Sequence, residues 1–239
     1  MLPWAGLGNP KPRINVNPYR PIKWQESESI ALPEATTDLH RQYLAQISEK
    51  DRYYNEVVKA RRTRYEFGRP PIDAISLLFD ISCRVRAEIP SSFGFPLTRR
   101  QAPSAGGVHP IHLVLHFDGE NSLCRYDPFH HSLCKLRARV DPAELRTAMN
   151  ELVDGQGAML LMMVAEPELT ATKYLSPDSL VWRDAGVLLG FLVLAAESLF
   201  LNFVPLGVTG DPWAGRLVDQ AGLVGVGAAL IGSRPCVGG

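Results

Sequence analysis

Apolar residues recur at three- and four-residue steps along two stretches in the first half of the chain. From about residue 37 to residue 62, leucine, tyrosine, isoleucine and valine follow this spacing, which predicts a helix. Pro70 and Pro71 end the pattern, because proline fixes φ and withholds an amide proton. A second helix is predicted from Ile72 to Arg86, with Asp73 near its start.

Short apolar and β-branched runs occupy the middle of the chain. The turn sequences DGEN and DPFHH separate them, which predicts three consecutive antiparallel strands at residues 111–117, 123–126 and 132–136. After the third strand, Asp141 is predicted to cap a helix that has Pro142 at its first position and ends near Asp154.

Two strongly apolar stretches follow. Residues 157–165 are almost continuously apolar, which is typical of a strand buried on both faces. Residues 178–200 predict the longest helix, whose apolarity on nearly every side places it in a core or a dimer interface. Short strands near residues 201–205 and 224–231 flank a small helix around residues 212–218. The elements neither alternate regularly as βαβ units nor repeat, so a mixed α+β fold is predicted.

The first part of the chain is rich in proline. Six of the 19 prolines fall within the first 33 residues, so residues 1–36 are predicted to form an extended, non-helical arm that wraps over the rest. Residues 37–239 are then predicted to form a single domain.

Composition and charge exclude several classes of protein. The chain has 25 basic and 25 acidic residues, so a general nucleic-acid binder or anionic-membrane binder is not expected. The N-terminus lacks the pattern of a signal peptide, which argues against secretion. The most apolar stretch, residues 187–208, contains Glu197 and Asn202, and a buried core helix therefore fits it better than a membrane span.

The cysteines and histidines do not predict a metal site. The four cysteines lack zinc-ligand spacing, and reduced thiols in a cytoplasmic protein are expected. His112 and His116 share one face of the predicted strand, whereas His109 precedes Pro110 in a loop, so the three imidazoles are not expected to converge.

A basic segment, KARRTRYEFGR, covers residues 59–69 with five basic residues and one Glu. Such a cluster could bind a phosphate or another anion. It could equally be the solvated end of a helix, where cations meet the negative end of the macrodipole, and this second explanation is the commoner one for an isolated cluster.

Two further segments are candidates for chemistry. PSAGGVHP, from Pro103 to Pro110, is a run of small residues that would let backbone amides approach a ligand, although it lacks the spacing of a dinucleotide-binding or phosphate-binding loop. Lys173 and Tyr174 follow the predicted buried strand, in a loop where catalytic groups are commonly found. A single Lys-Tyr pair is more often an accident of the surface.

Taken together, these segments resemble the nitroreductase-like flavoproteins, and specifically the SagB-type or McbC-like dehydrogenases that oxidise azoline rings in peptide natural products. The resemblance covers almost the whole chain and is carried by PYRPIKWQESESIALPE, RRTRYEF, APSAGGVHPIHLVLHF, CRYDPFHHSLCKL, TKY, WRDAGVLLGFLVLAAESLFLNFVPLG and ALIGSRP. It implies a homodimer with a nitroreductase-like α+β fold, in which a mainly antiparallel sheet is flanked by helices and FMN is bound across the subunit interface.

The resemblance also implies roles for particular residues. Arg61, Arg62 and Thr63 would hold the FMN phosphate. The family pattern has a second basic residue where this chain has Tyr65, so either Arg64 serves from a shifted register or the phosphate loses one partner. The other implied flavin contacts are the loop Pro103, Ser104, Ala105, Gly106 and Gly107, the turn Pro205, Leu206 and Gly207, and Arg234 near the C-terminus.

The implied reaction converts a thiazoline or oxazoline into a thiazole or oxazole, with hydride transfer to the flavin and proton transfer to the pair Lys173 and Tyr174. A lysine base requires a dry pocket or a nearby cation that lowers its pKa. A cyclodehydratase complex and a modified precursor peptide are the implied partners. Two alternatives remain: an NAD(P)H-dependent nitro or quinone reductase, and a flavin-free structural partner in a biosynthetic complex.

Overall fold

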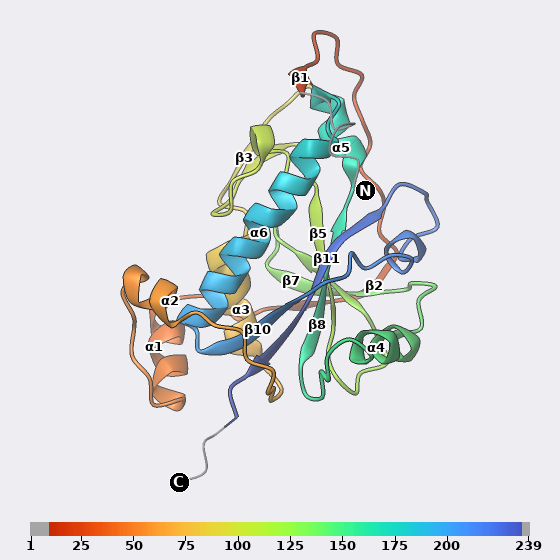
Figure 1. Ribbon diagram of the computed structural model, residues 1–239. Helices are drawn as coiled ribbons and strands as arrows, with labels where there is room; N and C mark the ends of the chain where they lie inside the picture. Colours follow the sequence, from red (N-terminus) through yellow and green to blue (C-terminus); the bar gives the residue numbers. More distant parts are fainter. Residues whose placement is uncertain (1–9, 236–239) are drawn as a thin grey trace.

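A seven-stranded antiparallel sheet lies at the centre of the computed structural model, which describes residues 10–235 (Figure 1). The strand order is β10-β11-β8-β5-β6-β7-β2, and every neighbouring pair is antiparallel. The strands are β2 (Glu26–Ala31), β5 (Ile111–His116), β6 (Cys124–Asp127), β7 (Ser132–Leu136), β8 (Met159–Ala165), β10 (Leu201–Leu206) and β11 (Val224–Ser233). The predicted mixed α+β architecture, with a mainly antiparallel sheet and flanking helices, is confirmed.

Helices cover both faces of this sheet. The helices are α1 (Thr37–Gln46), α2 (Tyr54–Ala60), α3 (Ile72–Ser82), α4 (Pro142–Asn150), α5 (Pro167–Lys173) and α6 (Asp178–Ser198). Helix α6 runs across one face together with α1, α2 and α3, and α4 covers the other (Figure 1). Small elements complete the fold: the two-stranded pairs β1 (Lys11–Pro12) with β9 (Tyr174–Leu175) and β3 (Ala87–Ile89) with β4 (Leu97–Arg99), and the short 3-10 turns η2 (Ala105–Gly107) and η3 (Ala214–Arg216).

Strand β8 separates two hydrophobic cores. Alternate side chains point to opposite faces of a strand, so Leu161 and Met163 enter the core beneath α3 and α6, whereas Leu160 and Met162 enter the core beneath α4. All seven residues of β8 are buried, which confirms the strand that its continuous apolar run predicts. The cap of α4 is confirmed as well, since the Asp141 carboxylate accepts a hydrogen bond from the Ala143 amide at 2.9 Å.

The single helix predicted over residues 37–62 is wrong, because the structure has two helices there. Helix α1 ends at Gln46, Ser48 adopts a φ of 56°, and α2 begins only at Tyr54. Within this interval, residues 48–52 (SEKDR) contain no apolar side chain, so no burial holds them in a continuing helix. This break turns Arg52 toward the end of α6.

The predicted second helix also extends too far. Helix α3 ends at Ser82 rather than at residue 86, and residues 87–89 instead pair with β4. The hydrogen bonds of Arg84 and Arg86 explain the early end, because both guanidinium groups reach back to the Asp80 carboxylate, at 3.3 Å and 2.6 Å. The predicted helix near residue 212 is reduced to the 3-10 turn η3, and α4 stops at Asn150, four residues before the expected end.

The proline-rich arm contributes structure that its composition does not predict. Residues 26–31 form the edge strand β2, which pairs with β7. Closer to its start, the arm contacts Glu166 at the end of β8, whose Oε1 atom accepts hydrogen bonds from the Tyr19 hydroxyl at 3.0 Å and the Ile22 amide at 2.7 Å. The division into an arm, residues 1–36, and a domain, residues 37–239, stays a prediction.

Helix α6 is the one described helix that is long and apolar enough to cross a membrane by length and composition. In the structure it packs on α3, on β10 and on the sheet strands β5, β8 and β11. Its last turn carries Glu197, whose side chain is only 3% exposed and forms three ion pairs. The helix therefore has the contacts of a core element along one side.

Candidate functional site

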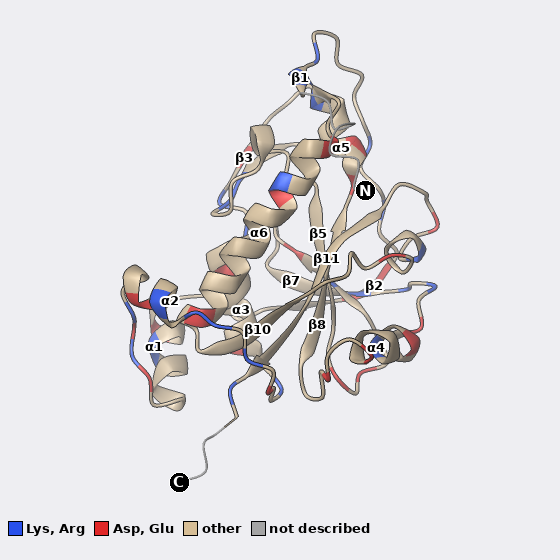
Figure 2. Cartoon of the chain, viewed as in Figure 1, with Lys and Arg blue, Asp and Glu red and all other residues tan. Residues whose placement is uncertain are grey.

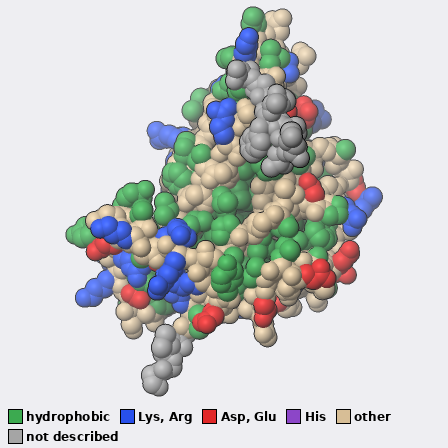
Figure 3. Space-filling model, in the orientation of Figure 1, with side chains coloured by type: hydrophobic (Ala, Val, Ile, Leu, Met, Phe, Trp, Pro, Cys, Tyr) green, Lys and Arg blue, Asp and Glu red, His purple; other side chains and the backbone are tan. Residues whose placement is uncertain are grey.

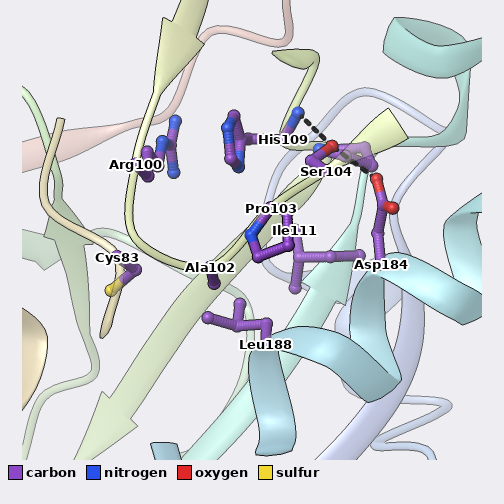
Figure 4. A pocket seen from close by; sticks show the side chains of 10 residues that line it. Cys83, Arg100, Ala102, Pro103, Ser104, His109, Ile111, Asp184 and Leu188 are labelled. Atoms are coloured by element: carbon purple, nitrogen blue, oxygen red, sulfur yellow. Dashed lines mark hydrogen bonds between the residues drawn. The ribbon is translucent and has the colours of Figure 1, made fainter. Parts of the chain in front are cut away.

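The loop of small residues that begins at Pro103 is anchored to the middle of the fold by Asp184 of α6. The Ser104 hydroxyl donates a hydrogen bond to Asp184 Oδ2 at 2.5 Å (Figure 4). The Ala105 amide donates to Asp184 Oδ1 at 3.1 Å. The Ser104 oxygen in turn accepts a hydrogen bond from the His109 amide at 2.9 Å. Burial raises the pKa of Asp184, although the hydrogen bonds from Ser104 and Ala105 oppose the rise.

The predicted catalytic pair lies directly against this loop. Lys173 Nζ donates a hydrogen bond to the Gly106 carbonyl at 2.8 Å. A Cβ atom at Gly106 would lie 2.5 Å from Lys173 Nζ and 2.6 Å from the Tyr174 hydroxyl, and Gly106 has a φ of 63°. Glycine is therefore required here both for backbone conformation and for the approach of the two functional side chains.

Lys173 and Tyr174 are held by regular structure, not by the loop that the sequence predicts. Lys173 ends α5 and Tyr174 begins β9, a change of direction that the short helix after Pro167 produces. The arm fixes this backbone, because β1 pairs with β9 and the Arg13 amide donates a hydrogen bond to the Lys173 carbonyl at 2.9 Å. The Lys173 ammonium lies 5.5 Å from the centre of the Phe93 ring, within cation–π range.

The side chain of Lys173 is only partly buried in the single chain. The dry pocket that a lysine base requires is thus not formed by residues 10–235 of one chain alone.

The basic segment places its residues in two different environments. Arg61, Arg62 and Thr63 are exposed. Arg64 instead turns inward, and its Nη1 atom lies 2.7 Å from Glu197 Oε2. Figure 2 shows the basic residues along the segment after α2, where this segment crosses the C-terminal end of α6. Of the two possibilities that the sequence leaves open, the geometry favours Arg64 as the inward-facing residue.

Arg234 lies in the same cluster, with Nη2 at 2.9 Å from Glu197 Oε1. The two arginines meet because Gly68 and Ser233 exchange backbone hydrogen bonds, each of 2.9 Å, which tie the segment after α2 to the end of β11. A Cβ atom at Gly232 would lie 2.6 Å from the Gly68 carbonyl oxygen, so this close approach requires glycine.

The remaining predicted flavin contact, Pro205 to Gly207, lies at the far end of the edge strand β10. Ser233 pairs with Leu201 at the start of β10, and Pro205 is four residues further along, which corresponds to about 13 Å. Within one chain, no hydrogen bond or ion pair joins this turn to Lys173, Tyr174 or the loop from Pro103 to Gly107 in the described residues.

Beside the anchored loop lies a small pocket between β5, α3 and α6. Its lining joins polar and apolar side chains, namely Cys83, Arg100, Ala102, Pro103, Ser104, His109, Ile111, Asp184 and Leu188, together with Pro110. Figure 4 shows Arg100 beside His109 at one side of the pocket. Burial raises the pKa of the Cys83 thiol to about 12, so this cysteine is not a nucleophile near neutral pH.

The three histidines of residues 109–116 contact three different partners. His109 Nε2 lies 3.0 Å from the Thr98 carbonyl oxygen, and His112 Nε2 lies 2.9 Å from Glu166 Oε2. His116 Nε2 lies 2.7 Å from the backbone carbonyl of Glu120. Their roles are therefore separate structural ones in the described part of the chain.

His109 predicts a pH dependence of stability. Burial, and secondarily the Arg100 charge, lower its pKa from 6.5 to about 3. The unfolded chain therefore binds a proton on this residue at a higher pH than the folded chain, so stability is lost as the pH falls from about 6.5 towards 3. The variant His109→Asn suits this position because asparagine tolerates the observed φ of 51°. Between pH 7 and pH 4, we expect its free energy of unfolding to fall by about 2 to 3 kcal/mol less than that of the wild type. Urea unfolding of both proteins at the two pH values measures this, and parallel losses would contradict it.

Three residues that complete the site are not predicted from the sequence to be functional residues. Asp184 and Glu197 are isolated carboxylates within the apolar helix α6, and each organises a separate group of ligand-binding candidates. Arg52 contributes a third ion pair to Glu197, at 3.1 Å. The available signal was a charged residue interrupting an apolar helix, because a charge that is buried there needs a hydrogen-bonded partner.

No protein-family model matches the sequence, and no curated protein matches it. Solved structures do match. A protein from Ralstonia eutropha JMP134 described as a nitroreductase is 21% identical, with a TM-score of 0.59, over 92% of this chain and 98% of that one. A chain of the E. coli microcin synthetase McbBCD complex, solved with truncated pro-MccB17 bound, is 16% identical with a TM-score of 0.50, over 81% of each chain. A protein from Desulfovibrio desulfuricans described as a nitroreductase and solved in complex with FMN is 17% identical with a TM-score of 0.50, over 80% of this chain and 91% of that one.

These matches confirm the nitroreductase-like fold that the sequence resemblance implies. At these levels of identity they establish the fold only, and function has to be argued from the residues of this chain.

Proposed function

We propose that this chain is an FMN-dependent oxidoreductase that acts as a homodimer and oxidises azoline rings in a peptide. The observation that carries the proposal is the meeting of Lys173, Tyr174 and the Gly106 backbone, where two proton-transfer groups lie against a glycine of the loop. A flat ring system can lie against such a loop, with both functional groups at its edge.

The residues present fit the phosphate and the ring of FMN. Three arginines surround the single carboxylate of Glu197, which leaves two positive charges for a phosphate monoester. The edge strand β10 leads from this cluster to the turn Pro205 to Gly207 over about 13 Å, a length suited to a flavin lying along the strand.

FMN, when bound, supplies a hydride acceptor at N5. Azoline oxidation breaks two C–H bonds on adjacent ring carbons and forms one ring double bond, so one hydrogen leaves as hydride and the other as a proton. Lys173, with Tyr174 beside it, is the group we assign to accept this proton. The Gly106 carbonyl would hold Lys173 Nζ at the loop, and the protein would have to exclude water there for the amine to act as a base.

The site requires a second copy of the chain. Asp184, which anchors the ring-binding loop, and Glu197, which lies at the arginine cluster, are thirteen residues apart on α6, or about 20 Å. The five-carbon ribityl chain that joins the ring of FMN to its phosphate is much shorter than this distance. Two copies that pair along α6 would bring the loop of one copy to the arginine cluster of the other, and would also cover Lys173.

The outer side of α6 is suited to such pairing. Trp182, Val187 and Phe191 are 42%, 36% and 37% exposed, and no atom lies within 4 Å of a Cβ position built at Gly186 or Gly190. Figure 3 shows hydrophobic side chains gathered on the face that α6 crosses. Small residues spaced by four let a second helix approach closely between the larger apolar side chains.

Phe191→Asp is therefore expected to convert the dimer into a monomer and to abolish FMN retention, because it places a charge in the apolar interface. Light scattering measures the mass, and absorbance measures the flavin. Glu151→Gln, an exposed change at the end of α4, is a control that should leave both unchanged. A dimeric Phe191→Asp protein with full flavin content would contradict the shared site.

A general NAD(P)H-dependent nitro or quinone reductase is the second candidate, favoured by the description of the Ralstonia and Desulfovibrio proteins as nitroreductases. The McbBCD match instead supports a role beside a cyclodehydratase complex and its precursor peptide. We place the protein in the cytoplasm, where the free thiols of Cys83, Cys124 and Cys134 would stay reduced.

One pair of assays separates the two candidates. The FMN-loaded protein is mixed with an azoline-bearing peptide, and mass spectrometry detects loss of two hydrogen atoms. It is then mixed with NADPH and a nitroaromatic compound, and the bleaching of NADPH is followed. Oxidation of the azoline supports the dehydrogenase, whereas rapid NADPH oxidation with untouched azolines would establish the reductase in its place.

A further inference from the structure

Glu197 is a buried carboxylate that interrupts the apolar helix α6 and takes no part in the proposed hydride and proton transfer. Its two oxygen atoms accept hydrogen bonds from three guanidinium groups. Oε1 lies 3.1 Å from Arg52 Nη1 and 2.9 Å from Arg234 Nη2, and Oε2 lies 2.7 Å from Arg64 Nη1. These arginines come from three separate segments, before α2, after α2 and after β11.

We propose that Glu197 is the positioning residue of a phosphate site made by Arg52, Arg64 and Arg234, and that it holds their guanidinium groups ready for the phosphate of FMN. This proposal rests on the proposed FMN-dependent function and assigns its phosphate site. It replaces Arg61 and Arg62, both exposed, with Arg52 and Arg234 as partners of Arg64.

The surplus of positive charge distinguishes this cluster from an ordinary structural ion pair. One carboxylate neutralises one arginine, and a second and third arginine at the same carboxylate repel each other. Glu197 is the one carboxylate that forms ion pairs with these three arginines in the described residues. A phosphate monoester carries nearly two negative charges at pH 7 and would balance the remaining two.

The arginines are oriented as well as gathered. The Arg52 guanidinium lies over the buried Phe200 ring, 3.9 Å from its centre, and that of Arg234 lies 5.2 Å from the same centre. Arg64 Nη2 also donates a hydrogen bond to the Ala60 carbonyl at 3.3 Å, which further fixes this side chain. Stacking fixes the plane of a guanidinium group, so its remaining donors point in fixed directions.

All three arginine side chains remain partly exposed. The exposed fractions of Arg52, Arg64 and Arg234 are 25%, 21% and 24%, whereas that of Glu197 is 3%. The carboxylate thus lies beneath the arginines, and an anion would approach from the solvent side. Each arginine has five N–H donors and uses only part of them here, which leaves donors for phosphate oxygens.

Glu197→Gln is the variant that tests positioning. A glutamine offers one acceptor oxygen and one NH₂ donor in place of two acceptors, so at least one of the three guanidinium groups faces another donor. Apo protein of the full chain is titrated with FMN and with riboflavin, which lacks the phosphate. We expect the FMN dissociation constant to rise about tenfold or more, through loss of a charge-assisted hydrogen bond, with that of riboflavin unchanged.

The same substitution at Glu120 is the matched control. Glu120 forms an ion pair of 2.8 Å with Arg69 in which both side chains are at least half exposed, and Glu120→Gln should leave both dissociation constants unchanged. Thermal unfolding of each variant checks that the chain is folded. If Glu197→Gln does not fold, Arg52→Gln serves instead, with the same expected loss for FMN alone.

The outcomes distinguish a failure of this proposal from a failure of the proposed FMN-dependent function. Tighter FMN binding by Glu197→Gln would mean that the carboxylate only reduces the positive charge of the cluster. It would contradict the proposal that Glu197 positions the guanidinium groups. Unchanged FMN binding, or an equal loss for FMN and riboflavin, would overturn it too. A wild type that binds neither flavin would reject the FMN-dependent function itself, and the phosphate assignment with it.

Discussion

Lys173→Ala and Tyr174→Phe should each lower the rate of azoline oxidation by about 10² to 10⁴, while FMN stays bound. Removal of a general base typically costs this much. Both side chains lie within 2.6 Å of the position that a Cβ atom on Gly106 would occupy, and neither belongs to the arginines that we assign to the phosphate, so neither change should release the flavin. The measurement is the rate at which an azoline-bearing peptide loses two hydrogen atoms.

The flavin spectrum and the reductase assay are the controls for this pair. A variant that retains its flavin absorbance is folded at the site, so a lower rate reflects a slower chemical step and not misfolding. Reduction of a nitroaromatic compound requires no carbon-bound proton to be removed, and its rate with NADPH should respond little to Lys173→Ala. Equal losses in both assays would mean that Lys173 has a structural role.

Arg64→Ala should weaken FMN binding by about tenfold to a hundredfold, because it removes a guanidinium group from the proposed phosphate site. Arg62→Ala is the matched control, since Arg62 is only two residues away but is exposed and forms no ion pair in the described residues. Equilibrium titration of the apo proteins with FMN measures both constants. A large loss for Arg62→Ala with none for Arg64→Ala would move the phosphate site to the exposed side of the segment.

Sequence patterns predict the centre of this fold well, because burial there leaves a clear signal. The continuous apolar run of β8 reflects cores on both faces, and the Asp141–Pro142 pair marks the start of α4 unambiguously. Helix α6 is also predicted to within two residues, since its apolar stretch is long and ends at the turn before β10.

Sequence patterns do not predict the elements that depend on contacts with residues far away in the sequence. Nothing in ESESIA predicts the edge strand β2, which exists because the edge of β7 offers unpaired backbone groups. The position of Arg52 after the break likewise involves an ion pair with Glu197, which is far away in sequence. Local propensity contains no information about such partners.

The candidate site shows the same division. The family resemblance brings Lys173, Tyr174 and the loop at Gly106 to attention, and the structure places them together. Asp184 and Glu197, which organise the two halves of the site, are visible in the sequence only as charges within an apolar helix. Which arginines surround Glu197 could be learned only from the packing of the segments around α2 and after β11 against the end of α6.

The flavin content of the purified protein tests the central claim most directly. The chain is purified without added cofactor, its absorption spectrum is recorded, and the ligand released by denaturation is identified by mass. The account predicts flavin absorption bands and release of FMN, because the arginine cluster offers a place for one phosphate group. Release of FAD, or a protein that takes up no flavin even with excess FMN, would contradict it.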